Sequence, residues 1–163
     1  MTRLKILLTA TLLAFLAGAS AAQEAPAQDA VIIQANEVKL GAYPGDPGKW
    51  GMKAAIVYGD PTKSDFYAER LSYPKNVMST PHSHTADRVV LVLSGTWYQG
   101  LGTELDPKKA VAVHAGGTVI QPKGQMHFDG SLGDEAVVQI VTLGRSGVVR
   151  AHPGEASFVK IAD

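Results

Sequence analysis

The sequence contains no cysteine among its 163 residues. Disulfide bonds, thiolate ligands and a lipidated cysteine are therefore excluded, and any bound metal must be held by imidazole nitrogen and by oxygen. The formal net charge is also zero, because 15 basic residues balance 15 acidic ones. A neutral balance gives no electrostatic footprint for nucleic acid or for an anionic membrane surface, so we expect neither as a partner.

The apolar run at residues 6–17 is too short for a comfortable membrane span, which needs about 20 residues. It follows the basic residues Arg3 and Lys5 and precedes the small residues of 18–22. This order is typical of a cleaved secretory signal peptide, and the alternative is an uncleaved anchor. We predict a signal peptide at residues 1–22, a flexible lead-in at 23–30 and a single domain at 31–163. The product is then periplasmic or secreted, without a stable membrane anchor.

Helical periodicity is missing too, and the chain has no obvious internal repeat. It reads instead as about ten short strands at roughly ten-residue spacing, separated by Gly and Pro. The runs at 89–93, 118–121 and 136–143 are the clearest of these. This pattern predicts an all-β fold, either a sandwich or a barrel.

The residues with metal-binding chemistry begin at His82 and His84, which lie two positions apart in an extended stretch. Side chains two apart lie on the same face of a strand, roughly 6–7 Å apart along it. Two imidazoles at this separation can lean onto one metal ion, with bonds of about 2.0–2.2 Å. A third histidine, His127, follows a strand and a Pro-x-Gly turn.

These two stretches resemble the two signature motifs of the cupin family. The first motif reads Gly, five residues, His-x-His, three or four residues, Glu, six residues, Gly. His82, His84 and Gly95 match it, whereas Asn76 stands at the leading Gly and Arg88 at the Glu.

The second motif reads Gly, five residues, Pro-x-Gly, two residues, His, three residues, Asn. Gly116, Pro122, Gly124 and His127 match it, and Ser131 stands at the Asn. The resemblance covers roughly residues 65–145. It implies an antiparallel jelly-roll β-barrel of one domain, which brings His82, His84 and His127 together near one mouth. It also raises a homodimer paired through edge strands as a further expectation.

The implied metal is a divalent transition metal, and three imidazoles suit iron, zinc, manganese, nickel or copper. Arg88 cannot be a ligand because a guanidinium has no free lone pair. Two accounts remain open: three histidines with open positions, or Asp87 as a fourth, oxygen ligand. In either account Arg88 is a candidate clamp for a substrate carboxylate.

Two functions follow, from different classes. The first is an exported metalloenzyme, dioxygenase-like or of another kind, that acts on a small organic substrate through the metal as Lewis acid or redox centre. The second is a non-catalytic module that binds or senses a small ligand in the barrel mouth. Motifs of this kind predict a fold far better than a reaction.

Overall fold

The structure is a computed structural model that describes residues 29–46, 49–63 and 65–162. The predicted signal peptide and all but the last two residues of the predicted lead-in lie outside the described residues. The chain divides into two units, Met1–Ile32 and Ile33–Asp163. The second unit contains every helix and strand discussed below.

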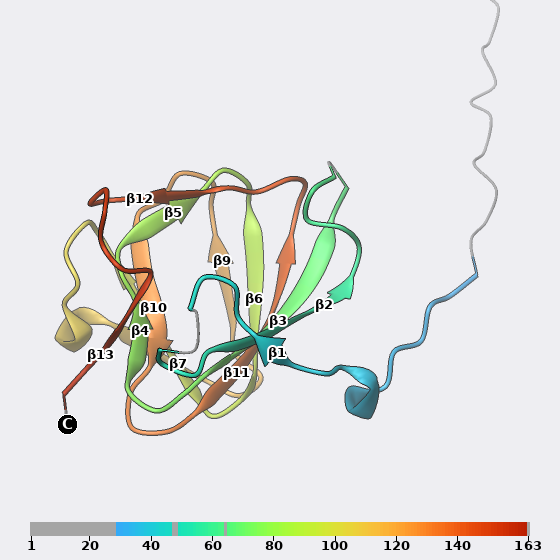
Figure 1. Cartoon of the computed structure of the whole chain (residues 1–163), viewed down its shortest axis with the longest axis horizontal. Helices are drawn as coiled ribbons and strands as arrows, with labels where there is room; N and C mark the ends of the chain where they lie inside the picture. The colour runs from blue at the N-terminus through green and yellow to red at the C-terminus, as the bar shows by residue number, and fades with distance from the viewer. Residues whose placement is uncertain (1–28, 47–48, 64, 163) are drawn as a thin grey trace, which may run out of the picture. The chain divides into compact units, whose positions relative to one another are not determined.

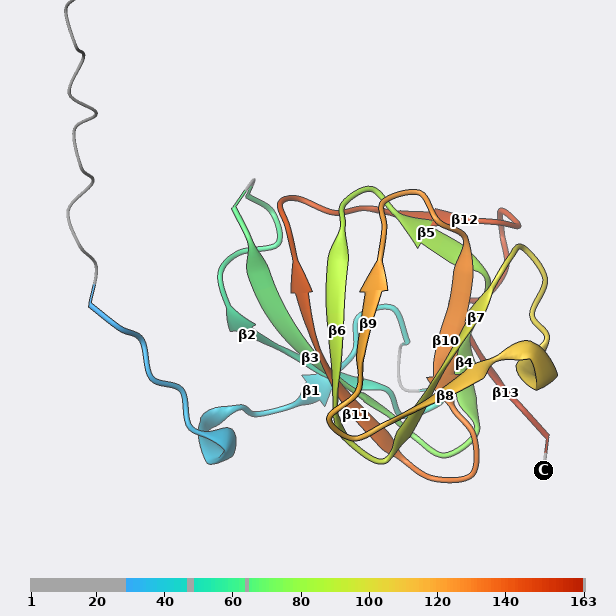
Figure 2. The ribbon, with the colours of Figure 1, turned by 180° about the vertical axis from the view of Figure 1, so that it is seen from behind.

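Antiparallel strands form two sheets that face each other (Figures 1 and 2). The first sheet has the order β1 (Gly41–Ala42), β2 (Lys53–Tyr58), β3 (Tyr67–Tyr73), β11 (Ala136–Thr142), β6 (Arg88–Ser94), β9 (Thr118–Gln121). The second has the order β12 (Val148–Arg150), β5 (His82–His84), β10 (His127–Ser131), β4 (Val77–Ser79), β13 (Phe158–Lys160). In this second sheet β7 (Thr96–Leu101) also pairs with β10 and with β8 (Val111–His114). The only helical turns in the described chain are η1 (Ala35–Glu37) and η2 (Pro107–Lys109).

This arrangement confirms the predicted all-β, antiparallel jelly-roll fold. Three short strands were absent from the expectation: β1 has two residues, and β4 and β12 have three each. Three residues are too few to show an alternating pattern, and all three residues of β4 are buried, so burial gives no alternation there either.

The core lies between the sheets and follows the period of two along the central strands. In β11 the residues alternate between buried and half-buried along its whole length. Val138 and Ile140 of β11 meet Val90 and Val92 of β6 in the interior, where Trp97 of β7 is fully buried. Burial of such side chains contributes about 1.5–3 kcal/mol each, so this cluster stabilises the packing of the two sheets against each other.

The turn before β4 explains one departure from the family motif. Asn76, at the position of the leading Gly, has φ of 59°. Asn is the residue that most readily replaces Gly in this left-handed region, because its short polar side chain bonds locally. Here its Oδ1 accepts a hydrogen bond from the backbone of Gly133 at 2.6 Å. Asn76 therefore holds a positive φ, a conformation that glycine adopts most readily.

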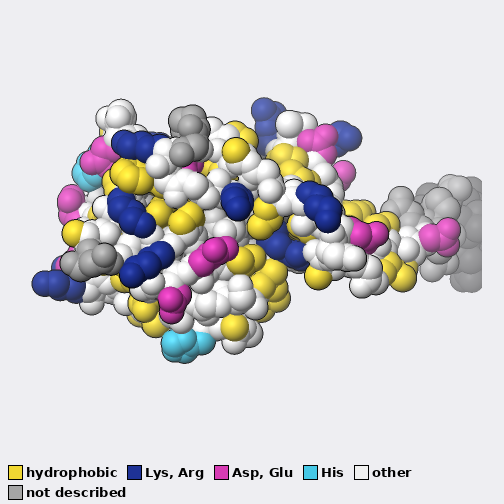
Figure 3. Space-filling model, turned by 60° about the horizontal axis from the view of Figure 1, so that its bottom comes forward, with side chains coloured by type: hydrophobic (Ala, Val, Ile, Leu, Met, Phe, Trp, Pro, Cys, Tyr) yellow, Lys and Arg dark blue, Asp and Glu magenta, His cyan; other side chains and the backbone are white. Residues whose placement is uncertain are grey.

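The surface carries mixed charge. On the face that Figure 3 shows, Lys and Arg side chains are interspersed with acidic and uncharged ones. Within the part of the chain that the structure describes, no helix has the length and hydropathy required to cross a membrane.

Candidate metal centre

The three motif histidines come from two neighbouring strands of the second sheet. His82 and His84 belong to β5, and His127 opens β10 directly opposite His82 in the antiparallel register. The period of two turns His82 and His84 to the same side of β5. All three residues are buried, with exposed fractions of 8%, 8% and 1%. Sequence motifs and register together therefore gather three imidazoles in the interior.

Their ring nitrogens converge closely enough for one ion. One ligand nitrogen from each histidine lies within 4.8 Å of the other two. The Nε2 atoms of His82 and His84 are 3.1 Å apart, and the rings of His82 and His127 have centroids 4.5 Å apart. No other group of three or more His, Cys, Asp or Glu side chains in the described residues is arranged for a metal.

Two of the rings are held by backbone carbonyls. Nδ1 of His82 lies 2.8 Å from the oxygen of Thr80, and Nδ1 of His127 lies 2.9 Å from the oxygen of Gln125. A carbonyl oxygen only accepts, so each Nδ1 must be the protonated donor. The Nε2 atoms of the neutral rings then present lone pairs to the centre, which is the usual way in which metal-binding histidines are oriented.

The environment favours neutral imidazoles. Burial lowers the pKa of His82, and the neighbouring His127 and Arg88 lower it further against the opposing effect of Asp129. Burial also lowers the pKa of His84 strongly, and the positive charge of Arg88 adds to this effect. Neutral rings are the form that binds a metal, so these directions suit coordination.

Arg88, the first residue of β6, points into the interior and is 6% exposed. Its guanidinium donates to Nε2 of His84, the same nitrogen that faces the centre. The side chain thus stands beside the histidines, which is one of the two directions that the sequence left open for a residue in the Glu position. In this arrangement Arg88 and a metal compete for one lone pair of His84.

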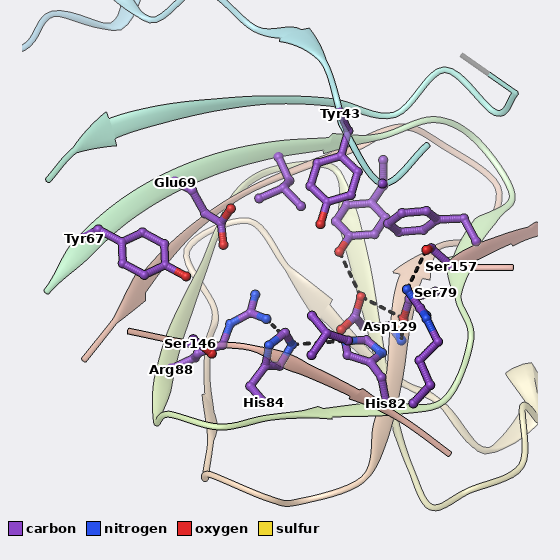
Figure 4. A pocket seen from close by; sticks show the side chains of 16 residues that line it. Tyr43, Tyr67, Glu69, Ser79, His82, His84, Arg88, Asp129, Ser146 and Ser157 are labelled. Carbon is purple, nitrogen blue, oxygen red and sulfur yellow. Dashed lines mark hydrogen bonds between the residues drawn. The ribbon is translucent and has the colours of Figure 1, made fainter. Parts of the chain in front are cut away.

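The histidines of β5 and Arg88 line a cavity of about 360 Å³ between the two sheets. Figure 4 shows Glu69 and Tyr67 projecting into it from β3, across from Arg88 and His84. The charged lining residues are Arg88, Arg150, Glu69 and Asp129. Burial raises the pKa of Glu69, although the positive charge of Arg88 opposes the shift. His127 lies deeper and does not line the cavity itself.

Asp129 anchors a buried network next to His127. Its Oδ1 accepts hydrogen bonds from the hydroxyls of Tyr73 at 2.9 Å and Ser79 at 3.3 Å. Burial raises the pKa of Tyr73 well above its ordinary value, and the Asp129 charge adds to this, so the hydroxyl keeps its proton. Sequence reasoning did not place Asp129 or Glu69 in the site. For Asp129 a signal existed, because it stands two residues after His127 and so shares its face.

Other candidates from the sequence lie elsewhere. Asp87 is exposed, and its Oδ1 accepts a hydrogen bond from the backbone of Lys123 at 2.7 Å, so it braces two loops. His114 is exposed on β8 and contacts Thr96 at 3.1 Å. His152 lies 2.9 Å from the oxygen of Thr103. None of them joins the three-histidine group.

Comparisons with known proteins agree with this architecture. A search of curated protein sequences gave no match. Similar solved structures include the polyketide cyclase RemF from Streptomyces resistomycificus, with a TM-score of 0.64 and 18% identity over 79% of this chain and 90% of that one. KdgF from Halomonas sp. has a TM-score of 0.53 and 21% identity over 71% of this chain and 96% of that one.

A third similar structure is the DMSP lyase DddQ from Ruegeria pomeroyi DSS-3, with a TM-score of 0.57 and 13% identity over 74% of this chain and 64% of that one. At these identities the likeness concerns the fold. The profile of the family described as Cupin matches residues 61–148, which is more than half of the sequence and includes both histidine motifs. The chain therefore belongs to the cupin family.

Proposed function

We propose that the protein is an exported cupin that holds one divalent transition metal through His82, His84 and His127 and acts on a small organic anion. The observation that carries the proposal is the convergence of three buried imidazole nitrogens within 4.8 Å. Nε2 of His127 is buried and has no hydrogen-bond partner among the described residues. A buried lone pair without a partner is costly unless a cation or a donor faces it.

The lone pairs of His82 and His84 support the same conclusion. Nδ1 of His82 donates to a carbonyl, so Nε2 of the neutral ring is an acceptor. Nε2 of His84 accepts from Arg88, so it is an acceptor as well. Two acceptors at 3.1 Å repel each other, and a shared metal ion removes that repulsion.

The charges of the cavity indicate the substrate class. Its lining has two cationic residues, Arg88 and Arg150, and two acidic ones, Glu69 and Asp129. A divalent ion bound by neutral histidines therefore leaves the cavity with a net positive charge. An organic anion restores the balance, and a carboxylate matches the planar fork of a guanidinium.

In this proposal Arg88 has two positions. Without metal it donates to His84, as observed. Metal binding takes over that lone pair, so Arg88 is released toward the cavity, where Glu69 is the acidic residue that lowers its electrostatic cost. There it can bind and orient the carboxylate of the substrate. A bound metal supplies Lewis acidity or a redox centre. The polyketide cyclase and the DMSP lyase share this fold, so the fold does not select the reaction.

Metal analysis of the protein purified from its native compartment tests the proposal. We expect close to one equivalent of a divalent transition metal in the unchanged protein and a small fraction of that in His82→Ala, His84→Ala or His127→Ala. His114→Ala, on the exposed β8, is the matched control and should keep full occupancy. Metal-free protein that also fails to take up Zn²⁺, Fe²⁺ or Mn²⁺ would contradict the proposal.

The export half of the proposal has a separate test. The basic, apolar and small-residue order of residues 1–22 supports cleavage near Gln23. Intact-mass measurement of the periplasmic or secreted protein should give a chain that begins close to this residue. A mass equal to that of the full sequence would contradict export by a cleaved signal.

One observation favours a second function, a metal-free cupin that binds a small anion without turnover. Arg88 already occupies the lone pair of His84, so its guanidinium could replace the metal permanently. Calorimetric titration with small carboxylates in the presence of a chelator separates the two functions. Binding that survives chelation, with no metal in the native protein, would support the second function.

A further inference from the structure

We infer that Asp129 supplies an oxygen ligand to the metal, in place of the motif carboxylate that Arg88 has replaced. The inference rests on the proposed function, because it assigns a fourth ligand to the same three-histidine site. It differs from the sequence-based alternative, in which Asp87 takes that role.

The strand β10 directs Asp129 to the site. Asp129 stands two residues after His127, so both side chains leave the strand on the same face, while Phe128 between them points to the opposite face. Asp129 is 3% exposed. A buried carboxylate carries a large desolvation cost, which is compensated by hydrogen bonds and by a nearby cation.

The two oxygens of Asp129 have different surroundings. Both hydroxyl partners, Tyr73 and Ser79, bond Oδ1. Oδ2 instead faces Nε2 of His127 at 3.6 Å, and both side chains are buried in the interior. The carboxylate is therefore held in place through one oxygen and presents the other to the histidine cluster (Figure 4).

This approach brings two acceptors together. Nδ1 of His127 donates to the oxygen of Gln125, so in the neutral form of the ring, the form that binds a metal, the lone pair lies at Nε2. That lone pair faces the carboxylate at a distance too long for a hydrogen bond, and Nε2 has no other partner among the described residues. A cation between Nε2 and Oδ2 turns this repulsive contact into an attractive one. A separation of 3.6 Å is also close to that of two neighbouring ligand atoms in a metal's shell.

Charge balance supports the same assignment. Arg88 brings a positive charge to the position where the family motif has a negative one. With only neutral histidines as ligands, a divalent ion would meet this charge uncompensated, whereas Asp129 offsets part of it. Asp129 is not one of the three residues whose ligand atoms converge within 4.8 Å, so its coordination requires a movement of the side chain from its position 3.6 Å from His127.

Metal titration of two matched variants of the mature protein tests the role of Asp129. In Asp129→Asn the amide oxygen can still accept from Tyr73 and Ser79, while the charge and the second oxygen are lost. In Ser79→Ala the carboxylate stays, whereas its hydrogen bond from the Ser79 hydroxyl and the hydrogen bond from the Asp129 backbone N–H to that hydroxyl are both lost. With Co²⁺ as the probe, in competition with a chelator, we expect Asp129→Asn to bind at least tenfold more weakly and Ser79→Ala to stay within about threefold of the parent. The visible absorption of bound Co²⁺ should also change in Asp129→Asn alone.

Equal losses in both variants would mean that Asp129 only supports the fold, and this outcome overturns the inference. Unchanged Co²⁺ affinity in Asp129→Asn overturns it as well, while leaving the three-histidine site intact. Asp87→Asn is the surface control and should match the parent.

A crystal structure of the unchanged protein with Zn²⁺ gives a test that does not depend on how the variants fold. The inference expects Oδ2 of Asp129 at about 2.0–2.2 Å from the ion. Zn²⁺ on the three histidines with Asp129 outside its shell overturns the inference and leaves the proposed function standing. A parent protein that takes up neither Co²⁺ nor Zn²⁺ overturns both.

Discussion

At the scale of single residues, the chemistry of the site depends on Arg88. Its guanidinium is buried and donates to His84, and Nε of the same side chain is buried without a partner in the described residues. Because an arginine remains protonated at any pH a protein tolerates, this is a permanent positive charge beside the candidate ligands. Metal binding must therefore overcome both the occupied lone pair and the repulsion between two cations.

We predict that Arg88→Gln increases the affinity for a divalent metal by about tenfold or more. The substitution frees Nε2 of His84. It also removes a positive charge that, at this short distance, repels a bound metal ion and so weakens metal binding. Competition between the protein and a chelator for Zn²⁺ measures the change. Affinity for small carboxylates should fall in the same variant, if Arg88 is their clamp.

Arg70→Gln provides the matched control for this substitution. Arg70 belongs to β3 but donates to Gln139 at 2.7 Å and does not line the cavity. Its variant should leave the metal affinity unchanged. An equal gain in both variants would indicate a general charge effect, and no gain in Arg88→Gln would mean that Arg88 does not compete with the metal.

The convergence of the three histidines could be predicted from the sequence, because motif spacing determines their strands and faces. The sequence also identified Arg88 as the residue that departs from the motif at the Glu position. It could not determine the direction of the side chain, since an arginine at the start of a strand can point to solvent or to the interior. Asp87, its neighbour, was the alternative oxygen ligand by spacing, but it is exposed and its carboxylate accepts a hydrogen bond from the backbone of Lys123. Asn76 is a departure from the motif in sequence, and its backbone angle shows that it adopts a left-handed conformation that glycine also adopts readily.

At the scale of elements, β10 organises the site, because it pairs with β5, β4 and β7. His127 and Asp129 face the site, and Phe128 packs on the other side opposite Gly100 of β7. A β-carbon at Gly100 would lie 2.0 Å from Cζ of Phe128. The glycine thus leaves the space in which the aromatic ring packs, and this packing fixes the strand that carries two candidate ligands.

We predict that Gly100→Ala destabilises the fold by about 1–3 kcal/mol, because Phe128 must move in a packed interior. Urea unfolding of the metal-free protein measures the change. Gly41→Ala in β1 is the control, since nothing lies within 4 Å of a β-carbon there, and it should change stability by less than about 0.5 kcal/mol. Similar values for the two variants would show that Phe128 adapts without cost.

The elements were predictable where strands are long enough to show a pattern. β6 and β11 each have seven residues and were read correctly from their apolar runs. Glu69 could not be assigned to the site, because its position depends on the pairing of β3 with β11, between segments about 70 residues apart along the chain. Long-range register of this kind leaves little trace in local sequence.

At the scale of the whole molecule, the interior between the sheets contains ionisable groups that a simple apolar core would lack. Burial keeps two of the histidines neutral by lowering the pKa values of His82 and His84. Burial has the opposite effect on the carboxyl of Glu69, whose pKa is raised. The unfolding free energy of the metal-free protein must therefore depend on pH, and the histidines and Glu69 contribute slopes of opposite sign.

We predict that metal-free protein loses stability as the pH falls below about 6.5, the ordinary pKa of histidine. In the unfolded chain His82 and His84 take up protons there, whereas in the folded chain their pKa values are lower, so acid favours unfolding. Each resisting histidine gives a slope that approaches about 1.4 kcal/mol per pH unit. Glu69 acts in the opposite sense, because burial raises the pKa of its carboxyl in the folded chain, so its protonation favours the folded state as the pH falls.

Urea unfolding between pH 7.5 and 5.5, a range of about two units around the histidine pKa, measures the net effect, and a histidine variant separates the histidine contribution. His84→Gln removes one histidine whose pKa is lowered in the folded chain. The slope of the unfolding free energy against pH in this range should therefore fall by up to about 1.4 kcal/mol per pH unit, the contribution of one proton. His114→Ala removes an exposed histidine from β8 and should leave the slope as it is in the parent. A parent protein whose stability is flat across this range would mean that the buried histidines protonate freely in the folded state, and so that the interior is open enough to solvate their charge.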